Sequence, residues 1–246
     1  MTSREATRLL TRSDLEGDMA ASLSDWAHRL LFGAIGWPWL LRSLSGGRPR
    51  DKAALLDRLG LPADSLPHLG SWKADTRLLG LIVDHIEAHR PASVVELGAG
   101  ASTLITARAL QSHGGGRLVS FDQHPDFVAA TRLWLADYGL DADIRAVDLA
   151  PSPGEWPGYW YDIAHLPDSI DLLIVDGPPW TIHPYVRGAA DTLFDRIAVG
   201  GTVMLDDGAR PGERIVAAIW REKWPNFDFR LESSGAKGTL IGTRTV

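Results

Sequence analysis

The sequence predicts an α/β fold: a doubly wound, mostly parallel seven-stranded sheet with a C-terminal antiparallel hairpin and an N-terminal helical extension. Short apolar runs alternate with longer amphipathic segments from residue 75 onward. This alternation is typical of a parallel sheet with right-handed crossovers. The run LLIV at 172–175 has the continuous apolar character of a strand covered on both faces. Pro178 and Pro179 end that strand, because proline lacks an N–H group and fixes φ.

The elements expected after residue 75 alternate along the chain. The expected strands are 93–97, 117–121, 143–147, 171–175 and 202–205, and the expected helices are 102–112, 125–138, 185–197 and 213–223. An earlier helix is expected between Asp75, a candidate N-cap, and Pro91. The tail segments FDFRLESS and GTLIGTRTV, joined by GAK, predict a hairpin at the sheet edge.

The chain is expected to divide into a helical extension or cap, residues 1–74, and the α/β domain, residues 75–246. Three of the ten tryptophans lie within 26–41, where the uncharged stretch between Arg29 and Arg42 is only twelve residues long. A membrane span needs about 20 apolar residues. We therefore predict a helical cap that packs on the domain or lines a substrate pocket. Peripheral contact of 26–44 with a membrane surface is the alternative.

The composition of this 246-residue chain limits the classes of ligand and of site that it can have. Its net charge of −6 gives no electrostatic case for nucleic acid. Cysteine is absent, which excludes disulfides, thiolate metal ligands and cysteine nucleophiles. Residues 1–20 are polar, with charges of both signs, and do not resemble a signal peptide. We expect a cytoplasmic protein, at most peripheral at the inner membrane face, that forms a homo-oligomer and acts on a small molecule or glycan.

The stretch VVELGAGAST at 94–103 predicts a strand, a glycine-rich turn and a helix start. Gly98 and Gly100 allow a tight turn and a close approach to a ligand. Ser102 and Thr103 can cap the helix, whose free N–H groups point to the same place. A dinucleotide fingerprint requires a third glycine where this chain has Thr103. That difference argues against a nicotinamide dehydrogenase.

Acidic residues stand at or near the ends of the first three expected strands. Glu96 would repel a pyrophosphate but can receive the amino group of an aminoacyl ligand. Asp122, followed by Gln123, ends the second strand, and one carboxylate there can accept hydrogen bonds from both hydroxyls of a ribose. Asp148 follows the third strand and could accept from an adenine amine.

In this order, VVELGAGAST, FDQ, AVDLA and IVDGPP resemble the motifs of the Rossmann-like (class I) S-adenosylmethionine-dependent methyltransferases, over about residues 75–246. The resemblance implies S-adenosyl-L-methionine as the cofactor. The cofactor residues expected are Glu96, Gly98, Gly100, Ser102, Thr103, Asp122, Gln123 and Asp148. WYD at 160–162, VDGPP at 175–179 and LDDGARPGE at 205–213 further resemble a bacterial subgroup with poorly defined substrates.

Asp176, Asp206 and Asp207 follow the fourth and fifth expected strands and should converge. Three close carboxylates repel one another unless they are protonated or bridged by a cation such as Mg²⁺. Catechol-type and macrolide-sugar O-methyltransferases have acidic metal ligands there, and the resemblance implies a metal that orients the substrate hydroxyl. In the alternative, Asp176 accepts backbone N–H bonds, Asp206 caps the following loop, and Asp207 pairs with Arg210 or Arg214.

The sequence offers several candidates for the base that removes the proton from the substrate. Catechol enzymes use a lysine where this chain has Pro179. His183 is then a candidate base, with an imidazole suited to neutral pH, and Asp176 or Asp207 would serve in a metal-free reaction. The alternative for His183 is a loop histidine that is solvated or packed by Trp180.

The loop 151–169 carries two tryptophans and two tyrosines, which predicts either a lid over the substrate or a plug at the sheet edge. Arg187 and Arg210 could bind an anionic substrate group or neutralise the acids. The function expected is O-methylation of a small-molecule, glycan or natural-product hydroxyl. Metal-independent N-methylation and a non-catalytic protein that binds cofactor or a membrane surface are the alternatives.

Overall fold

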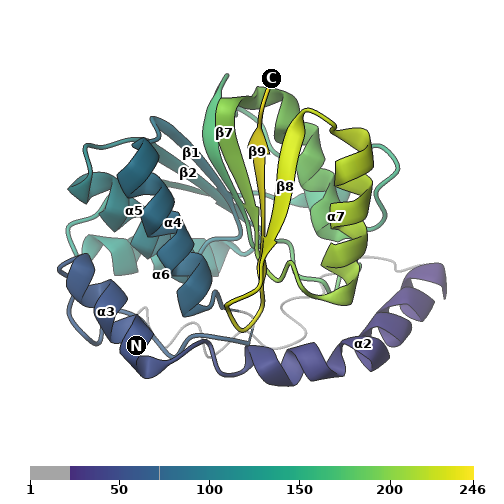
Figure 1. Ribbon diagram of the computed structural model, residues 1–246, viewed down its shortest axis with the longest axis horizontal. Helices are drawn as coiled ribbons and strands as arrows, with labels where there is room; N and C mark the ends of the chain where they lie inside the picture. Colours follow the sequence, from purple (N-terminus) through teal and green to yellow (C-terminus); the bar gives the residue numbers. More distant parts are fainter. Residues whose placement is uncertain (1–22, 72) are drawn as a thin grey trace.

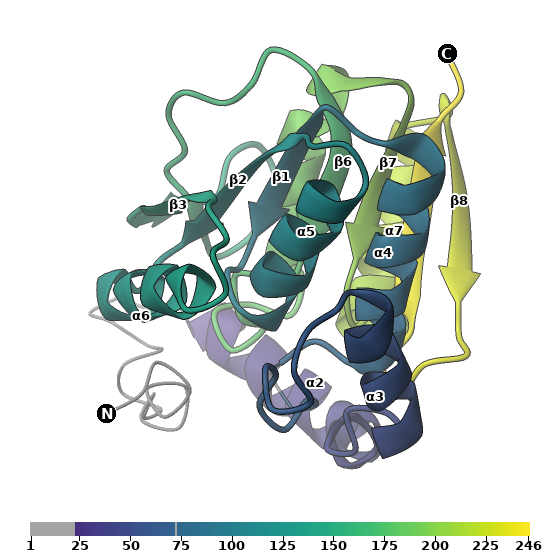
Figure 2. The ribbon, with the colours of Figure 1, turned by 90° about the vertical axis from the view of Figure 1, so that its left-hand side faces the viewer.

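The computed structural model describes residues 23–71 and 73–246. The prediction about a signal peptide in 1–20 therefore lies outside the described residues. Two layers of helices enclose one central sheet, and the helix α2 (Leu23–Ser43) runs along one edge of the sandwich (Figures 1 and 2).

The sheet has seven strands in the order β3-β2-β1-β6-β7-β9-β8. Its strands are β1 (Ser93–Leu97), β2 (Arg117–Asp122), β3 (Asp143–Ala146), β6 (Ile170–Val175), β7 (Ile197–Leu205), β8 (Phe227–Glu232) and β9 (Thr239–Arg244). The first five strands in space pair in parallel. The last strand of the chain, β9, lies antiparallel between β7 and β8. The predicted fold class, including the terminal hairpin, is confirmed.

Alternation along β6 explains why its sequence is apolar throughout. Leu172 and Ile174 belong to the core formed with α3 (Pro49–Arg58), α4 (Thr76–His89), α5 (Ala101–Ser112) and α6 (Pro125–Ala136). Leu173 and Val175 point into the opposite core, under η1 (Val186–Arg196) and α7 (Pro211–Lys223). Both faces of the strand are therefore buried in hydrophobic cores, as the sequence predicts.

Two elements differ from the expectation. The segment predicted as an α-helix over 185–197 winds as the 3₁₀ helix η1. Gly188, which favours helix poorly, lies so close to Trp156 that an added Cβ would be 2.1 Å from the ring. The long loop 151–169 contains half of a two-stranded ribbon, β4 (Leu149–Pro151) and β5 (Tyr159–Tyr161).

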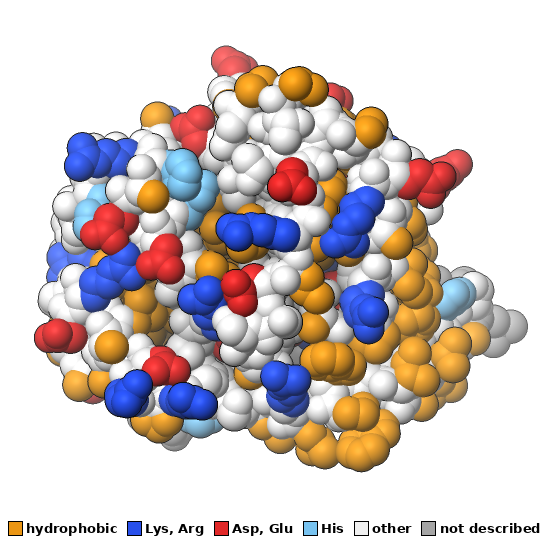
Figure 3. All heavy atoms as spheres, in the orientation of Figure 1, with side chains coloured by type: hydrophobic (Ala, Val, Ile, Leu, Met, Phe, Trp, Pro, Cys, Tyr) orange, Lys and Arg blue, Asp and Glu red, His pale blue; other side chains and the backbone are white. Residues whose placement is uncertain are grey.

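The N-terminal helix α2 crosses the edge at which the parallel strands end (Figure 1). Arg29 anchors it by donating two hydrogen bonds to the carbonyl oxygen of Ile182, at 3.0 and 2.6 Å. Its other face carries exposed apolar side chains, and hydrophobic side chains gather at the lower right of Figure 3, where Figure 1 places α2. They include Trp26, Leu30, Leu31, Ile35, Trp37 and Leu41. Within the described residues, no helix has the length and apolarity needed to span a bilayer.

Candidate active site

A cavity of about 360 Å³ lies at the carboxyl ends of the parallel strands, under α2. Phe32 and Trp39 of α2 line it on one side, and Trp180 lines it from the loop after β6. Its floor comes from the first loop and from the loops that follow β2, β6 and β7. Ligands bind at this edge in open α/β sheets, and the predicted role of 26–41 as a cap that lines a pocket agrees with it.

Gly98 sets the shape of the first loop. It has φ of 96°, a conformation that favours glycine. A Cβ at this position would come within 2.7 Å of the backbone nitrogen of Gly177, so the loops after β1 and β6 touch here. Gly98, Gly100 and Ser102 line the cavity, as the glycine-rich turn predicts.

Glu96 lies directly behind this loop and is completely buried. One carboxylate oxygen, Oε2, accepts hydrogen bonds from the hydroxyls of Thr103 at 2.5 Å and Ser120 at 2.6 Å. Burial outweighs these bonds and raises the pKa of Glu96. Its second oxygen, Oε1, is buried without a hydrogen-bond partner. Glu96 and Thr103 thus form a layer behind the cavity lining.

Asp122 lines the cavity at the end of β2. Its carboxylate accepts the N–H groups of Ala99 at 3.2 Å and His124 at 2.9 Å. Burial raises the pKa of Asp122 to about 7. The neighbouring Gln123 also lines the cavity, and its buried side-chain oxygen has no hydrogen-bond partner. Within the described residues, the carboxylates of Glu96 and Asp122 accept hydrogen bonds only from neutral donors, and oxygens of Glu96 and Gln123 have no partner. Such a set of acceptors fits a ligand that carries an amino group, hydroxyls and a positive charge.

Asp148, unlike Glu96 and Thr103 directly behind the lining, is an expected cofactor residue that lies away from this cavity. Its side chain is exposed, and it is not among the residues that line the cavity. It lies between β3 and β4, where its carbonyl oxygen accepts the N–H of Asp162 at 2.9 Å. The short β4–β5 ribbon, which the sequence did not predict, follows Asp148 directly.

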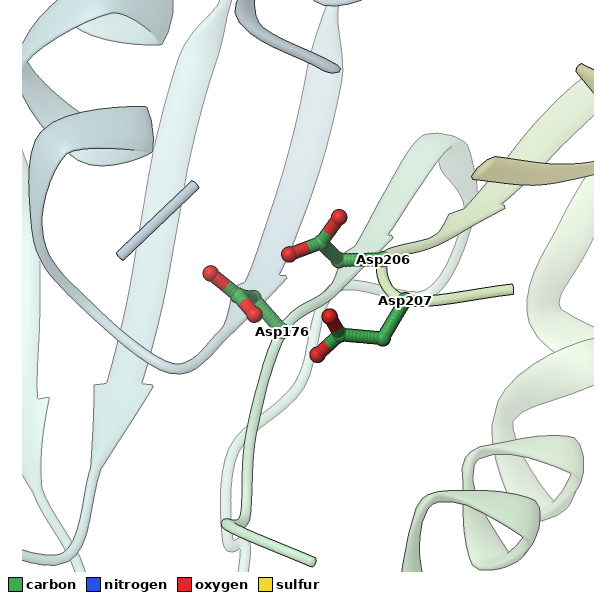
Figure 4. Close-up of side chains that lie close together, drawn as sticks. All are labelled: Asp176, Asp206 and Asp207. Carbon is green, nitrogen blue, oxygen red and sulfur yellow. The ribbon is translucent and has the colours of Figure 1, made fainter. Parts of the chain in front are cut away.

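Asp176, Asp206 and Asp207 converge as predicted, and one oxygen of each lies within 4.8 Å of the others. Figure 4 shows the three side chains close together, with Asp206 and Asp207 directed toward Asp176. Asp176 is the most accessible of them, with 11% of its side chain exposed against 0% for Asp206 and 5% for Asp207.

Three cationic side chains surround these carboxylates. Arg187 pairs with Asp207 at 3.0 Å and with Asp176 at 3.3 Å. Arg210 pairs with Asp207 at 2.5 Å, as the alternative interpretation of the sequence predicted. Lys237 pairs with Asp206 at 3.0 Å and lies 3.5 Å from Asp207.

The pairing separates the pKa values of the acids. Burial, followed by the charge of Asp206, raises the pKa of Asp176 well above its usual range. Burial alone would also raise the pKa of Asp207, but Arg210, Lys237 and Arg187 together lower it. Asp176 is therefore the carboxylate that binds a proton most readily among those facing the cavity near β6 and β7.

His183 does not line the cavity. It is 2% exposed, and its ring packs against His28 and Tyr185, with centroids 5.2 and 5.0 Å apart. Its Nδ1 accepts the N–H of Tyr185 at 3.1 Å. This environment favours a packing role over the predicted role as a base.

Residues 95–208 match the family model of a methyltransferase domain. The matched segment runs from β1 to the loop after β7 and so includes most of the loops that line the cavity. Among solved structures, the chain is similar to the SAH-bound methyltransferase PaMTH1 of Podospora anserina, at 15% identity and a TM-score of 0.55, over 94% of this chain and 100% of that one. It is also similar to an O-methyltransferase from Bacillus cereus in complex with SAH, at 14% identity and a TM-score of 0.54, over 81% of this chain and 92% of that one.

A methyltransferase from Geobacter sulfurreducens gives 17% identity and a TM-score of 0.51, over 79% of this chain and 86% of that one. At these identities the likeness is one of fold. No curated protein matches the chain.

Sequence reasoning missed Lys237 at this site, and it left Tyr161 within a loop predicted as either a lid or a plug. Lys237 lies in the hairpin connection, far along the chain from the acids that it pairs with. Tyr161 lines the cavity with its hydroxyl buried and without a partner, while Trp156 of the same loop donates to Asp191 at 3.0 Å. The loop 151–169 therefore acts mainly as a plug, and Tyr161 is its contribution to the cavity.

Proposed function

We propose that this chain is an S-adenosylmethionine-dependent methyltransferase that methylates a hydroxyl group of a small molecule. The observation that carries the proposal is Asp122, which lines the cavity beside the glycine-rich loop, with the buried Glu96 behind that loop; among the described residues both accept only from neutral donors. A cationic cofactor with a ribose suits this wall. The SAH in the complexes of the Podospora and Bacillus proteins supports the same cofactor.

When bound, the cofactor supplies a methyl group whose bond to sulfur breaks as a bond to the acceptor oxygen forms, while sulfur keeps the electron pair and the acceptor loses its proton. Asp176 is the group we assign to that proton. It faces the cavity, and burial raises its pKa, which makes its carboxylate form a stronger proton acceptor than an exposed aspartate. The side chains of this chain otherwise align the two reactants, which is the larger part of such catalysis.

The acceptor is proposed to carry a flat apolar ring beside its hydroxyl. Phe32, Trp39 and Trp180 give the cavity aromatic walls, and such walls favour stacking on a ring. The O-methyltransferase from Bacillus cereus supports oxygen as the acceptor atom. A simple phenol therefore fits better than a polar glycan.

The test is calorimetric titration with S-adenosylmethionine and, in parallel, NAD, followed by mass spectrometry of phenols, sugars and amines incubated with protein and cofactor. Heat with S-adenosylmethionine alone and a gain of one methyl on phenols are expected. No heat with S-adenosylmethionine would sink the proposal, and methylation confined to amines would move it to N-methylation.

A further inference from the structure

The cation that balances Asp206 and Asp207 is part of the chain itself. Lys237 Nζ lies 3.0 Å from Asp206 Oδ2 and 3.5 Å from Asp207 Oδ1. The other oxygen of Asp207 is held by Arg187 and Arg210. Asp206 Oδ1 is buried without a hydrogen-bond partner and could contribute one ligand to a metal ion. A divalent cation of the Mg²⁺ type, however, needs about six oxygen ligands in an octahedron.

Each of the three aspartates already has a cationic partner, and Arg210 is also shared with the buried Glu213, at 3.2 Å. Asp176, Asp206 and Asp207 face the cations Arg187, Arg210 and Lys237. A divalent ion bound between Asp206 and Asp207 would lie against the ammonium group of Lys237, which it repels. The residues present therefore do not fit the predicted metal unless Lys237 leaves.

Lys237 is held in place from two sides. Its backbone N–H and that of Ala236 donate to Oδ2 of Asp75, at 3.2 and 2.8 Å. The other oxygen of Asp75 caps α4 by accepting the N–H of Leu78 at 2.9 Å. On the other side, Ala209, in the loop after β7, donates its N–H to the carbonyl oxygen of Lys237 at 3.2 Å. The side chain is only 1% exposed.

We infer that the ammonium group of Lys237 takes the place of a divalent cation among Asp176, Asp206 and Asp207, so that the chain needs no metal for methyl transfer. The statement about methyl transfer rests on the proposed function, whereas the statement that Lys237 occupies the cation site rests on the geometry alone. Lys237 acts as a positioning residue that holds the carboxyl groups of Asp206 and Asp207 in place beside Asp176.

The experiment is thermal unfolding of EDTA-treated protein, with and without millimolar Mg²⁺ or Mn²⁺, for the wild type and Lys237→Met. The wild type should show no metal-dependent change in Tm. Lys237→Met should unfold at a lower temperature and regain about 2–4 °C when a metal is present at several times its Kd. A saturable rise in the wild type would overturn the inference, as would a folded Lys237→Met that does not respond to metal.

Lys223→Met is the matched control, because Lys223 also pairs with a buried aspartate, Asp191, at 2.7 Å, but away from the cavity. It should gain no response to metal. If Lys237→Met does not fold, two other measurements test the inference: metal-dependent unfolding of Lys237→Arg, which keeps the charge, and direct Mn²⁺ titration of the wild type. Binding of Mn²⁺ to the wild type would refute the inference. Calorimetry with S-adenosylmethionine in EDTA separates the two proposals, since absent heat refutes the proposed function and leaves the metal result standing.

Discussion

The cavity has two acidic walls, and the chain balances them in different ways. In the first wall, at the ends of β1 and β2, Asp122 lines the cavity and Glu96 lies behind the lining, and both accept hydrogen bonds from hydroxyl or backbone N–H groups. No cationic side chain in the described part of the chain pairs with either. At the ends of β6 and β7, Arg187, Arg210 and Lys237 pair with the acids. The first wall can therefore still attract a positively charged ligand. In the second wall, cationic side chains of the protein already compensate the negative charges of the aspartates.

The same comparison explains how one edge serves two reactants. Burial without a counter-charge raises the pKa values of Glu96 and Asp122, which a cationic ligand would reverse. In the second wall only Asp176 combines a raised pKa with access to the cavity. A cofactor with a sulfonium charge is therefore expected at the first wall, and the proton transfer at the second.

The largest expected effect comes from Asp176→Asn. Removing the proposed proton acceptor should lower kcat by about 10²–10⁴-fold, while the calorimetric Kd for S-adenosylmethionine stays near the wild-type value because the first wall is intact. His183→Asn is the control, and its kcat should change little, since His183 lies outside the cavity lining. The reverse pattern, with His183→Asn inactive and Asp176→Asn active, would exchange their roles.

The two walls should also differ in what they contribute to stability. Arg187→Met leaves Asp176 and Asp207 buried with less counter-charge, and removal of one member of a buried ion pair costs about 3–5 kcal/mol. Thr103→Val removes a neutral donor from Glu96 and should cost about 1–3 kcal/mol. Urea unfolding measures both free energies. A loss for Thr103→Val as large as that for Arg187→Met would contradict the comparison.

The sequence predicts the first wall better than the second for a physical reason. Glycines, capping hydroxyls and the acid at a strand end are neighbours along the chain, so their roles follow from local geometry. Lys237 meets Asp206 only because β9 inserts beside β7, and no local pattern encodes that contact. The early start of β7 at Ile197, rather than at residue 202, was hidden by Gly200 and Gly201.

A smaller effect tests which acids hold the cofactor. Asp122→Asn should weaken binding of S-adenosylmethionine by about 10–100-fold, because hydrogen bonds to a charged group contribute about 1.5–3 kcal/mol. Asp148→Asn, at the exposed position that the sequence also predicted, should bind like the wild type. Calorimetry at pH 8 compares the two. Equal losses would mean that the adenine reaches Asp148 and that the cavity closes further than the structure shows.

The smallest effect is a dependence of cofactor binding on pH. The pKa of Asp122 is raised from 3.8 to about 7 in the ligand-free protein, so the carboxylate that we propose accepts the ribose hydroxyls forms only as the pH rises through 7. Affinity for S-adenosylmethionine should increase up to about tenfold between pH 6 and pH 8, and Asp122→Asn should abolish most of this change.

The same shift has the opposite sign for the stability of the ligand-free protein. Between the unfolded pKa of 3.8 and the folded value of about 7, the native state binds the proton more tightly than the unfolded chain does. The free energy of unfolding therefore falls as the pH rises through this window. Urea unfolding of the wild type and Asp122→Asn across the window should show a shallower fall in the variant. Identical slopes would mean that Asp122 keeps its proton no more tightly than an exposed aspartate, and the contrast between the two walls would lose its electrostatic basis.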